Sequence, residues 1–498
     1  MLNKSEKKES KKRTLIIDVN HGALDIAEEY LSNKDDKYSR NIVIWDIYGK
    51  INKLNKLSSS NGINSFSDKD KEIYQKYNKL KEFYPDLEII ANLKNGLDYS
   101  KFEEVIAPVH CAIDIKFKTF HEAVSEIINK KYKDIKPKII TITGVKGKTS
   151  TSELINHILS DKYSVYLHNS NKGSITPTEV LNILNNLKKN GKLPKYDYFV
   201  FEISLGLVYS KFGLITNILE EYDIAKNLRT AKVKLDTLKF VENCYMLKEL
   251  FKTYKNEIES LNIKNLNLNL IDDKPPNLKI ISKYPLKFEY DNMEMKDYKI
   301  NHVFEFDKKI FGVHHIQNGI LSYEICRNMM SSEDIIKRIK SFELKNRMEL
   351  IAKNILKNTN PGLNIKSISN SIVDFIETFE NPIICIGGDF GCTCEEINAE
   401  KLFEQILKLF DNINSSKKFE ATEKRFQNNP INIYLSGELG NELFNIWHNK
   451  KTSCEFEDKY MTYKLITDKK IINEQDLSDL GLLNDKNNYL IIYRSSIV

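Results

Sequence analysis

The chain has 498 residues, of which 41% are hydrophobic, and this length is enough for about three packed domains. Its 75 basic and 69 acidic residues are mixed along the chain and leave a net charge of +6, which argues against a nucleic-acid-binding protein. No apolar run reaches the roughly 18 residues of a membrane-spanning helix, so no membrane partner is expected. The seven scattered cysteines argue against a disulfide framework and for a reducing, cytoplasmic location.

The N-terminal region begins with a polar, lysine-rich segment, residues 1–13, which we expect to be a disordered tail rather than a signal peptide. After it, residues 14–18 predict a strand, residues 24–31 a helix and residues 42–45 a second strand. This βαβ pattern is typical of an α/β domain. Residues 50–81 are rich in Lys, Asn and Ser, and we expect an insertion or flexible excursion there.

Two histidines follow strands of this first region. His21 lies just after the first strand, and His110 ends the strand-like run that starts at residue 105. Both are therefore expected at the carboxyl edge of a parallel sheet, where open α/β sheets bind ligands. Each could be a hydrogen-bonded turn histidine or could bind substrate. The first turn has a single glycine, so dinucleotide binding is a weak interpretation.

The stretch around which the chain is organised lies in the central region. Residues 139–143 form a β-branched run typical of a buried strand, and a helix with one apolar face is expected from residue 150 onward. A glycine-bounded turn between strand and helix presents backbone N–H groups and a helix N-terminus to phosphate. Lys148 would reach the terminal phosphates of a nucleotide, and the Thr149 hydroxyl would meet Mg²⁺. The residues expected to contact the nucleotide here are Gly144, Val145, Lys146, Gly147, Lys148, Thr149 and Ser150.

A second feature of this region suits metal binding. The apolar run at residues 196–201 ends at Glu202, and a further strand at residues 212–217 ends in Thr-Asn. A carboxylate at the end of a strand beside a phosphate loop can hold Mg²⁺ directly or through water. Thr149 and Glu202 are therefore the predicted Mg²⁺ ligands.

The glycine spacing of the loop is unusual, because only two residues separate Gly144 from Gly147, whereas the common phosphate loop has four. This shortened G-x-x-G-K-T resembles the ATP loop of the Mur ligases, which join a carboxylate to a nucleophile at the expense of ATP. Mur ligases also carry a glutamate followed by serine, as at Glu202, and a strand ending in Thr-Asn, as at Asn217. The resemblance implies an ATP-dependent ligase that uses Mg²⁺, with Asn217 at the nucleotide.

Two further motifs extend this resemblance over most of residues 138–362. The family's G-x-H-N-x-x-N matches at Gly312, His314 and Asn318, and implies that His314 and Asn318 contact the nucleotide. A histidine pair at this point could also bind zinc, but neither a cysteine nor a helical partner accompanies it. The family's Gly-Arg-(Met/Leu)-Glu resembles the motif at Arg347, which would neutralise the phosphates when the third domain closes over ATP.

The chain departs from the family's pattern around a second metal. Mur ligases follow Thr-Asn with an Asp-His pair, which is missing here, so a second metal would need Glu221 or Asp223. The family also has an Ala-Lys whose lysine is carbamylated to bridge metal ions. Lys232 is the nearest match and Lys234 its rival, with a solvated surface lysine as the alternative. The catalytic residues that the resemblance implies are Lys148, Glu202, Lys232 and Arg347.

The resemblance implies an α/β fold with the three-domain architecture of a Mur ligase. Residues 14–137 would form a Rossmann-like N-terminal domain that holds the substrate. Residues 138–342 would form a P-loop ATPase domain, and residues 343–498 a second Rossmann-like domain. Within the last, residues 408–430 are expected to be another low-complexity insertion.

More narrowly, several stretches are similar to the archaeal members of the family that make coenzyme F(430), a nickel tetrapyrrole. They are residues 17–23, 44–48, 108–110, 143–150, 360–364 and 387–396. By this resemblance the substrate is a nickel-containing tetrapyrrole acid. ATP would phosphorylate its propionate side chain, and a ring carbanion would attack the acyl phosphate to close a carbocyclic ketone. His21 and His110 would lie near the carboxylates or the nickel of that substrate.

Two other functions agree with part of the sequence. The runner-up is a peptide ligase of an archaeal pseudomurein-like wall, with the same ATP chemistry and an amine nucleophile. Asparagines at residues 358–364 replace the acid and histidine of Mur ligases, which counts mildly against it. A nucleotide-binding switch is a different class of protein. GTP-binding switches carry N-K-x-D after the phosphate loop, whereas in this chain the motif lies before the loop, at residues 33–36. A switch would also leave the third domain unexplained. The sequence does not indicate an oligomeric state.

Overall fold

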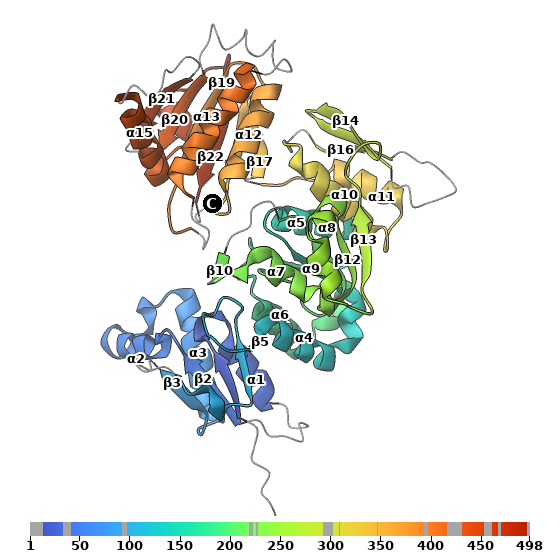
Figure 1. The fold of residues 1–498 in the computed structure, drawn as a ribbon, viewed down its shortest axis with the longest axis vertical. Helices are drawn as coiled ribbons and strands as arrows, with labels where there is room; N and C mark the ends of the chain where they lie inside the picture. Colours follow the sequence, from blue (N-terminus) through green and yellow to red (C-terminus); the bar gives the residue numbers. More distant parts are fainter. Residues whose placement is uncertain are drawn as a thin grey trace, which may run out of the picture. The chain divides into compact units, whose positions relative to one another are not determined.

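The structure is a computed structural model (Figure 1) that describes residues 13–32, 41–91, 97–218, 223–225, 228–291, 302–307, 309–345, 347–392, 397–415, 431–452, 461–466 and 470–495. The predicted tail lies outside these residues, except for Arg13, which begins the first strand. The chain divides into two compact units, one of residues 1–152 and 162–270, the other of residues 153–161 and 271–498. The domain limits expected after residues 137 and 342 stay a prediction.

The first unit begins with a five-stranded parallel sheet in the order β3-β2-β1-β4-β5. Its central strand, β1, is a run of β-branched and leucine residues buried on both faces, as parallel sheets require. The strands predicted at residues 14–18 and 42–45 and the helix predicted at residues 24–31 are confirmed. The elements are β1 (Arg13–Ile17), α1 (Ala23–Ser32), β2 (Asn41–Asp46), α2 (Lys50–Asn61), α3 (Asp68–Phe83), β3 (Glu88–Ala91), β4 (Glu104–Ala107), β5 (Lys118–Thr119) and α4 (Phe120–Lys131).

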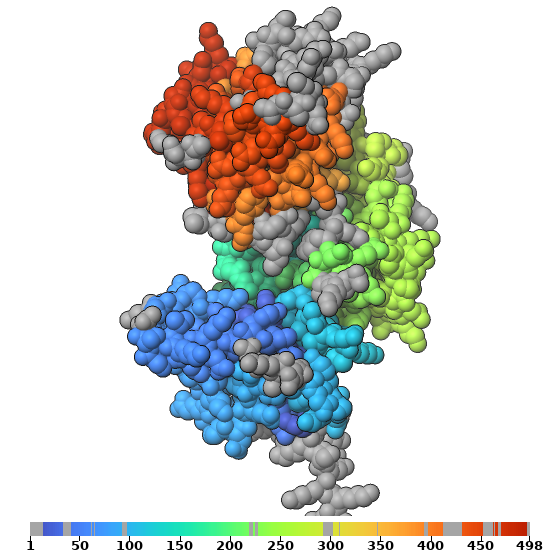
Figure 2. Space-filling view, turned by 60° about the vertical axis from the view of Figure 1, so that its left-hand side comes forward, coloured from blue at the N-terminus to red at the C-terminus, as the bar shows by residue number. Residues whose placement is uncertain are grey.

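The flexible insertion expected at residues 50–81 is wrong, because this segment forms the helices α2 and α3. Its many Lys, Asn and Ser residues lie on solvent faces, while Leu54, Ile73 and Leu80 recur at helical spacing and are buried in the core of the unit. Ser67 caps the start of α3 by accepting a hydrogen bond from Asp70 N–H. Figure 2 shows this blue segment as part of one packed body.

A six-stranded sheet in the order β13-β12-β9-β6-β8-β7 follows, with the paired strands β12, β9, β6, β8 and β7 parallel. One apolar core connects it to the first sheet through α1, α4 and α6, since Ile16, Val124 and Phe199 belong to the same buried cluster. The elements are β6 (Ile139–Thr143), α5 (Lys148–Leu159), β7 (Val165–His168), α6 (Pro177–Lys189), β8 (Tyr198–Glu202), β9 (Ser210–Ile215), β10 (Asp223–Ala225), β11 (Leu228–Arg229), α7 (Thr230–Leu235), β12 (Val241–Leu247), α8 (Lys248–Thr253), α9 (Lys255–Ser260) and β13 (Asn267–Ile271).

The second unit contains a small antiparallel sheet, β14-β15-β16, and a six-stranded sheet in the order β17-β18-β22-β19-β20-β21. In the larger sheet only the β17–β18 pair is antiparallel. Of the insertion expected at residues 408–430, residues 408–415 lie in helix α13 and the rest falls outside the described residues. The elements are β14 (Leu278–Lys283), β15 (Leu286–Tyr290), β16 (His302–Glu305), α10 (His314–Cys326), α11 (Ser332–Lys340), β17 (Arg347–Ala352), β18 (Ile355–Thr359), α12 (Ile365–Thr378), β19 (Pro382–Gly388), α13 (Ala399–Ser415), β20 (Ile431–Ser436), α15 (Gly437–Thr452), β21 (Met461–Ile466), α16 (Glu474–Asp479) and β22 (Asn488–Arg494).

Candidate active site

The turn between β6 and α5 has the backbone that a phosphate loop needs. Gly144 and Gly147 have φ angles of +144° and +84°, which residues with a side chain rarely adopt. A Cβ on Gly144 would lie 2.1 Å from the hydroxyl oxygen of Thr216, so close packing also requires glycine there. α5 begins at Lys148, two residues earlier than predicted, so the loop ends at a helix N-terminus, whose partial positive charge suits an anion.

The residues that follow β9 hydrogen-bond to the backbone of this loop. The backbone N–H of Val145 donates to the carbonyl oxygen of Asn217 over 2.7 Å, and that of Lys146 donates to Asn217 Oδ1 over 3.1 Å. Thr216 Oγ1 donates to the carbonyl oxygen of Lys146 over 2.5 Å. The Thr-Asn pair therefore fixes the backbone of the phosphate loop, and a direct contact of Asn217 with the nucleotide stays a prediction.

The two predicted Mg²⁺ ligands lie together beside the loop. Thr149 Oγ1 lies 2.9 Å from Ser170 Oγ, and the backbone N–H of Ser170 donates to Glu202 Oε2 over 3.1 Å. Lys148 Nζ lies 4.0 Å from Glu202 Oε1. Thr149 and Glu202 are both buried, and their hydroxyl and carboxylate oxygens are the hard donors that Mg²⁺ prefers. Ser170 was missed, because it lies in the loop after β7, where no motif marks it.

Helix α7 distinguishes the two candidate lysines for carbamylation. Lys232 is exposed, whereas the side chain of Lys234 is among the largest fully buried ones. Burial, and then the charge of Lys148, hold the pKa of the Lys234 amine well below its usual value. Burial and the lowered pKa therefore make Lys234 the better placed of the two lysines for carbamylation, while a role for Lys232 stays a prediction. For a second metal, Asp223 is exposed in β10, and Glu221 lies outside the described residues.

The other predicted nucleotide contacts belong to the second unit. His314 begins α10 and is exposed, while Asn318 lies one turn later with 4% of its surface exposed. The preceding Val313 N–H donates to Asp374 Oδ2 of α12 over 3.2 Å, which ties the start of α10 to the larger sheet's helices. Arg347 begins β17 opposite Asn358. The structure thus places the predicted nucleotide residues in two groups, one in each unit.

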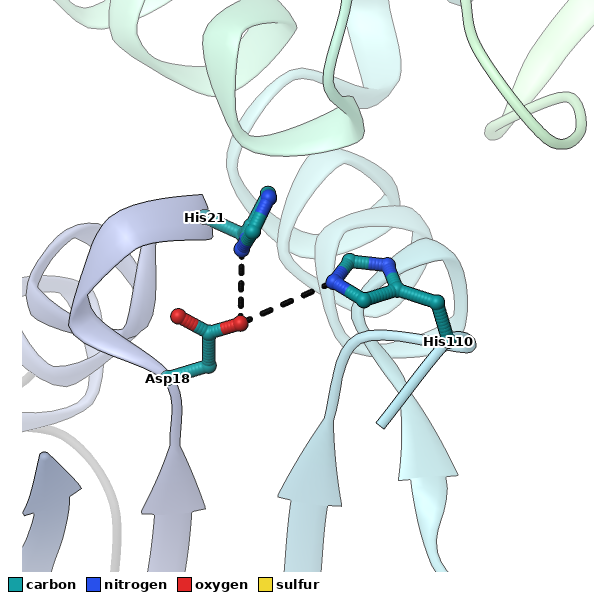
Figure 3. A group of neighbouring side chains, drawn as sticks. All are labelled: Asp18, His21 and His110. Atoms are coloured by element: carbon teal, nitrogen blue, oxygen red, sulfur yellow. Dashed lines mark hydrogen bonds and ion pairs between the residues drawn. The ribbon is translucent and has the colours of Figure 1, made fainter. Parts of the chain in front are cut away.

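The predicted substrate residues form a compact cluster with a third side chain at the carboxyl edge of the first sheet (Figure 3). His21 Nδ1 lies 2.6 Å and His110 Nε2 lies 3.6 Å from Oδ2 of Asp18. The two imidazole rings meet edge to face, with centroids 4.4 Å apart. Asp18 was not predicted, although its position at the end of a strand, three residues before His21, is a signal that could have identified it.

Asp18 is an ionised carboxylate in a buried position. Its side chain is 1% exposed, against 35% for His21 and 26% for His110. Burial alone would raise the pKa of Asp18, but the contacts of His110 and His21 outweigh it and lower the pKa to about 2. Among the described residues this is the one group of three His, Cys, Asp or Glu side chains close enough to share an ion.

Comparison with known proteins identifies the family. The chain is 44% identical over 436 residues to a coenzyme F(430) synthetase of Methanocaldococcus jannaschii, covering 86% of this chain and 92% of that protein. The chain belongs to the coenzyme F(430) synthetase family. A family model described as "Coenzyme F430 synthetase CfbE, C-terminal domain" matches residues 348–472, and the Mur ligase middle domain matches residues 142–326. A coenzyme F(430) synthetase of Methanosarcina acetivorans is 27% identical over 250 residues, covering 44% of this chain and 46% of that protein.

Solved structures place this synthetase family in the Mur ligase fold. A MurF ligase of Thermotoga maritima in complex with ADP aligns with a TM-score of 0.52 at 14% identity, covering 79% of this chain and 86% of that one. A MurF of Acinetobacter baumannii gives the same TM-score, covering 80% and 83%. The predicted α/β Mur-ligase architecture is confirmed, and the chain is a ligase of this type. Among the described helices, none is both long and apolar enough to cross a membrane.

Proposed function

We propose that this ligase consumes ATP to close a carbon–carbon bond in a nickel-containing tetrapyrrole acid. In this reaction a propionate carboxylate of the seco-precursor acid becomes an acyl phosphate, a ring carbon displaces the phosphate, and coenzyme F(430), ADP and phosphate are released. The observation that carries the proposal is the 44% identity, over nearly the whole of the relative, to a coenzyme F(430) synthetase.

ATP would bind with its phosphates at the turn between β6 and α5. The positive φ angles of Gly144 and Gly147 and the start of α5 at Lys148 support this, because the glycine turn ends at a helix N-terminus, whose partial positive charge suits phosphate. Lys148, 4.0 Å from Glu202, would balance charge on the transferred phosphoryl group. Arg347, Asn318 and His314, to which the resemblance to Mur ligases assigns nucleotide contacts, belong to the second unit.

Mg²⁺ fits the oxygen atoms of Thr149 and Glu202, which would hold it beside the phosphates. Bound there, the ion would neutralise charge on the phosphate oxygens. The N–H of Ser170 orients one oxygen of Glu202 and leaves the other toward Lys148. Lys234 would contribute as a carbamate near Lys148, because burial lowers the pKa of its amine and so favours the neutral form that takes up CO₂. Lys232 lacks that burial.

The tetrapyrrole would lie at the carboxyl edge of the first sheet, where Asp18, His21 and His110 meet. This edge belongs to the same unit as the phosphate loop. The hydroxyl of Thr178, at the start of α6, donates to the carbonyl oxygen of His21 over 3.1 Å, so the turn that carries His21 contacts the helix that follows the loop of Ser170.

The proposal is tested by coupled ADP release from purified protein with ATP and Mg²⁺, with and without the nickel seco-tetrapyrrole acid. Tetrapyrrole-stimulated ADP release with a shifted product spectrum is the expected result. ADP release that ignores the tetrapyrrole but responds to an amino acid or peptide would instead indicate a pseudomurein-type peptide ligase. Tight GTP binding without turnover would contradict both ligase interpretations.

A further inference from the structure

The Asp18–His21 pair leaves one imidazole nitrogen unused. His21 Nδ1 is engaged with Asp18 Oδ2 at 2.6 Å, the short separation of a charge-assisted hydrogen bond. Because the ionised carboxylate can only accept, Nδ1 carries a proton, and in the neutral form of the ring Nε2 carries the lone pair. Figure 3 shows Nε2 pointing away from Asp18. The partly exposed His21 ring therefore presents a basic nitrogen to the edge of the sheet.

Asp18 is held rigidly in the orientation that this pairing needs. Its Oδ1 accepts the backbone N–H of Asn20 over 2.9 Å, and its backbone has a φ angle of +82°, which is costly for a residue other than glycine. The His110 ring packs edge to face on the ring of His21 and restricts its rotation. A buried carboxylate in this position would stabilise an imidazolium at His21 without itself taking the proton.

The same geometry is less suited to a bound metal ion. The three ligand-type atoms lie within 4.8 Å of one another, but the His21 nitrogen among them is already hydrogen-bonded to Asp18. An ion bound at His21 Nε2 would have Asp18 as the carboxylate partner of Nδ1, as is usual for ligating histidines, but Asp18 would then not be one of its ligands. The three side chains therefore do not form one shared ligand set through their present contacts.

A short series of contacts connects the His21 turn with the residues proposed to hold Mg²⁺. Thr178, which donates to the His21 carbonyl oxygen, lies at the start of α6, directly after the loop that follows β7. Ser170 of the same loop contacts both Thr149 and Glu202. One short segment of a single unit therefore touches the turn that carries His21 and the residues proposed to hold Mg²⁺.

We propose that His21 is the catalytic base of ring closure and that Asp18 is its positioning residue; this rests on the proposed function. His21 Nε2 takes the proton from the acidic carbon of the substrate. The electron pair of that C–H bond forms the new C–C bond to the acyl carbon. The bond between the acyl carbon and the phosphate oxygen breaks, and phosphate leaves with its electron pair. The imidazolium then returns its proton to water.

The test separates activation from ring closure in the full chain. With ATP, Mg²⁺, the nickel seco-tetrapyrrole acid and hydroxylamine, an acyl phosphate that does not cyclise is captured as a hydroxamate. His21→Ala should slow ring closure by at least about 100-fold, while hydroxamate forms at nearly the wild-type rate. Added imidazole should restore part of the ring closure. His448→Ala, on the exposed surface of α15, is the matched control and should change neither product.

Asp18 is tested through its dependence on His21. Asp18→Asn should slow ring closure by about tenfold or more in the wild-type background, and should have no further effect in the His21→Ala background. A purely structural role would make the two losses add. Asp18→Asn should also leave the capture of hydroxamate nearly unchanged.

The remaining outcomes of these experiments would contradict either this inference or the proposed function. Ring closure by His21→Ala at the wild-type rate would overturn the inference. Loss of both hydroxamate and ADP in His21→Ala would also overturn it, because His21 would then bind the substrate. Loss of one bound transition-metal ion per chain in that variant would overturn it as well, because His21 would then be a metal ligand. Absence of tetrapyrrole-stimulated ADP release in the unaltered chain would contradict the proposed function itself.

Discussion

The hydroxyl of Thr178 donates to the carbonyl oxygen of His21 over 3.1 Å, and this contact joins the carboxyl edge of the first sheet to helix α6. The next residue, Gly22, makes the approach possible. Its φ angle is +112°, and a Cβ there would lie 2.2 Å from Thr178 Oγ1. The turn that carries His21 is therefore shaped by its packing against α6 as well as by Asp18.

This packing predicts the effect of Gly22→Ala. The variant should lose about 1–3 kcal/mol of stability more than Gly191→Ala, because both glycines have positive φ but only Gly22 meets another side chain. Thermal unfolding of the two variants measures the difference. Equal unfolding temperatures would show that Thr178 moves aside without cost. Ring closure should fall in Gly22→Ala, since the His21 turn would shift.

Lys148→Ala should lower tetrapyrrole-dependent ADP release by at least about 100-fold, because the ammonium group that lies 4.0 Å from Glu202 would be lost from the proposed phosphate site. Lys192→Ala, an exposed lysine in the turn after α6, is the matched control and should remain active. ADP release and ATP binding are measured together. A Lys148→Ala enzyme with ordinary turnover would remove this lysine from the proposed phosphate site.

Much of the fold was predictable, because apolar runs and glycine turns act locally. The strand before Gly144 and the helix after it follow from the sequence pattern, and their order in the sheet follows the family. The helices at residues 50–61 and 68–83 were missed because composition concealed widely spaced apolar positions. The amino-acid composition of such a segment is dominated by the residues on its solvent-exposed face, whereas a few buried apolar residues decide whether it packs as a helix.

The candidate site was predictable only where a motif marks it. Lys148 and Glu202 stand at fixed places after strands, so their proximity follows from the parallel sheet. Asp18 and Ser170 act through contacts between segments that are distant in the sequence or lie in unmarked loops. The choice between Lys232 and Lys234 depends on which side of a short helix is buried, and six residues are too few for periodicity to decide it.

Carbamylation predicts opposite behaviour for two lysines of one helix. Lys234→Ala should lose about 100-fold or more of the ligase activity, and a short carboxylate such as acetate should restore part of it by replacing the carbamate oxygens. Lys232→Ala should remain active, because its side chain is exposed. Activity of the unaltered enzyme should fall when CO₂ and bicarbonate are removed. Loss of activity in Lys232→Ala with retention in Lys234→Ala would reverse the assignment.

The buried carboxylate of Asp18 predicts a specific dependence of stability on pH. Its pKa is about 2 in the folded protein and 3.8 in an unfolded chain, because the contacts of His110 and His21 outweigh burial. A lowered pKa means that the stabilisation is complete above about pH 4 and is lost as the pH falls through about 2. The difference of nearly two pKa units corresponds to about 2 kcal/mol.

Asp18→Asn removes this titration and is the variant with which to measure it. The unfolding free energy of the unaltered chain should exceed that of Asp18→Asn most strongly above about pH 4, and the gap should narrow by up to about 2 kcal/mol as the pH falls toward 2. Asp98→Asn, at an exposed turn, is the control, and its gap should be small at every pH. A difference in unfolding free energy that stays constant with pH would mean that the two histidines do not hold this carboxylate ionised. The inferred pairing of Asp18 with His21 would then lose its electrostatic support.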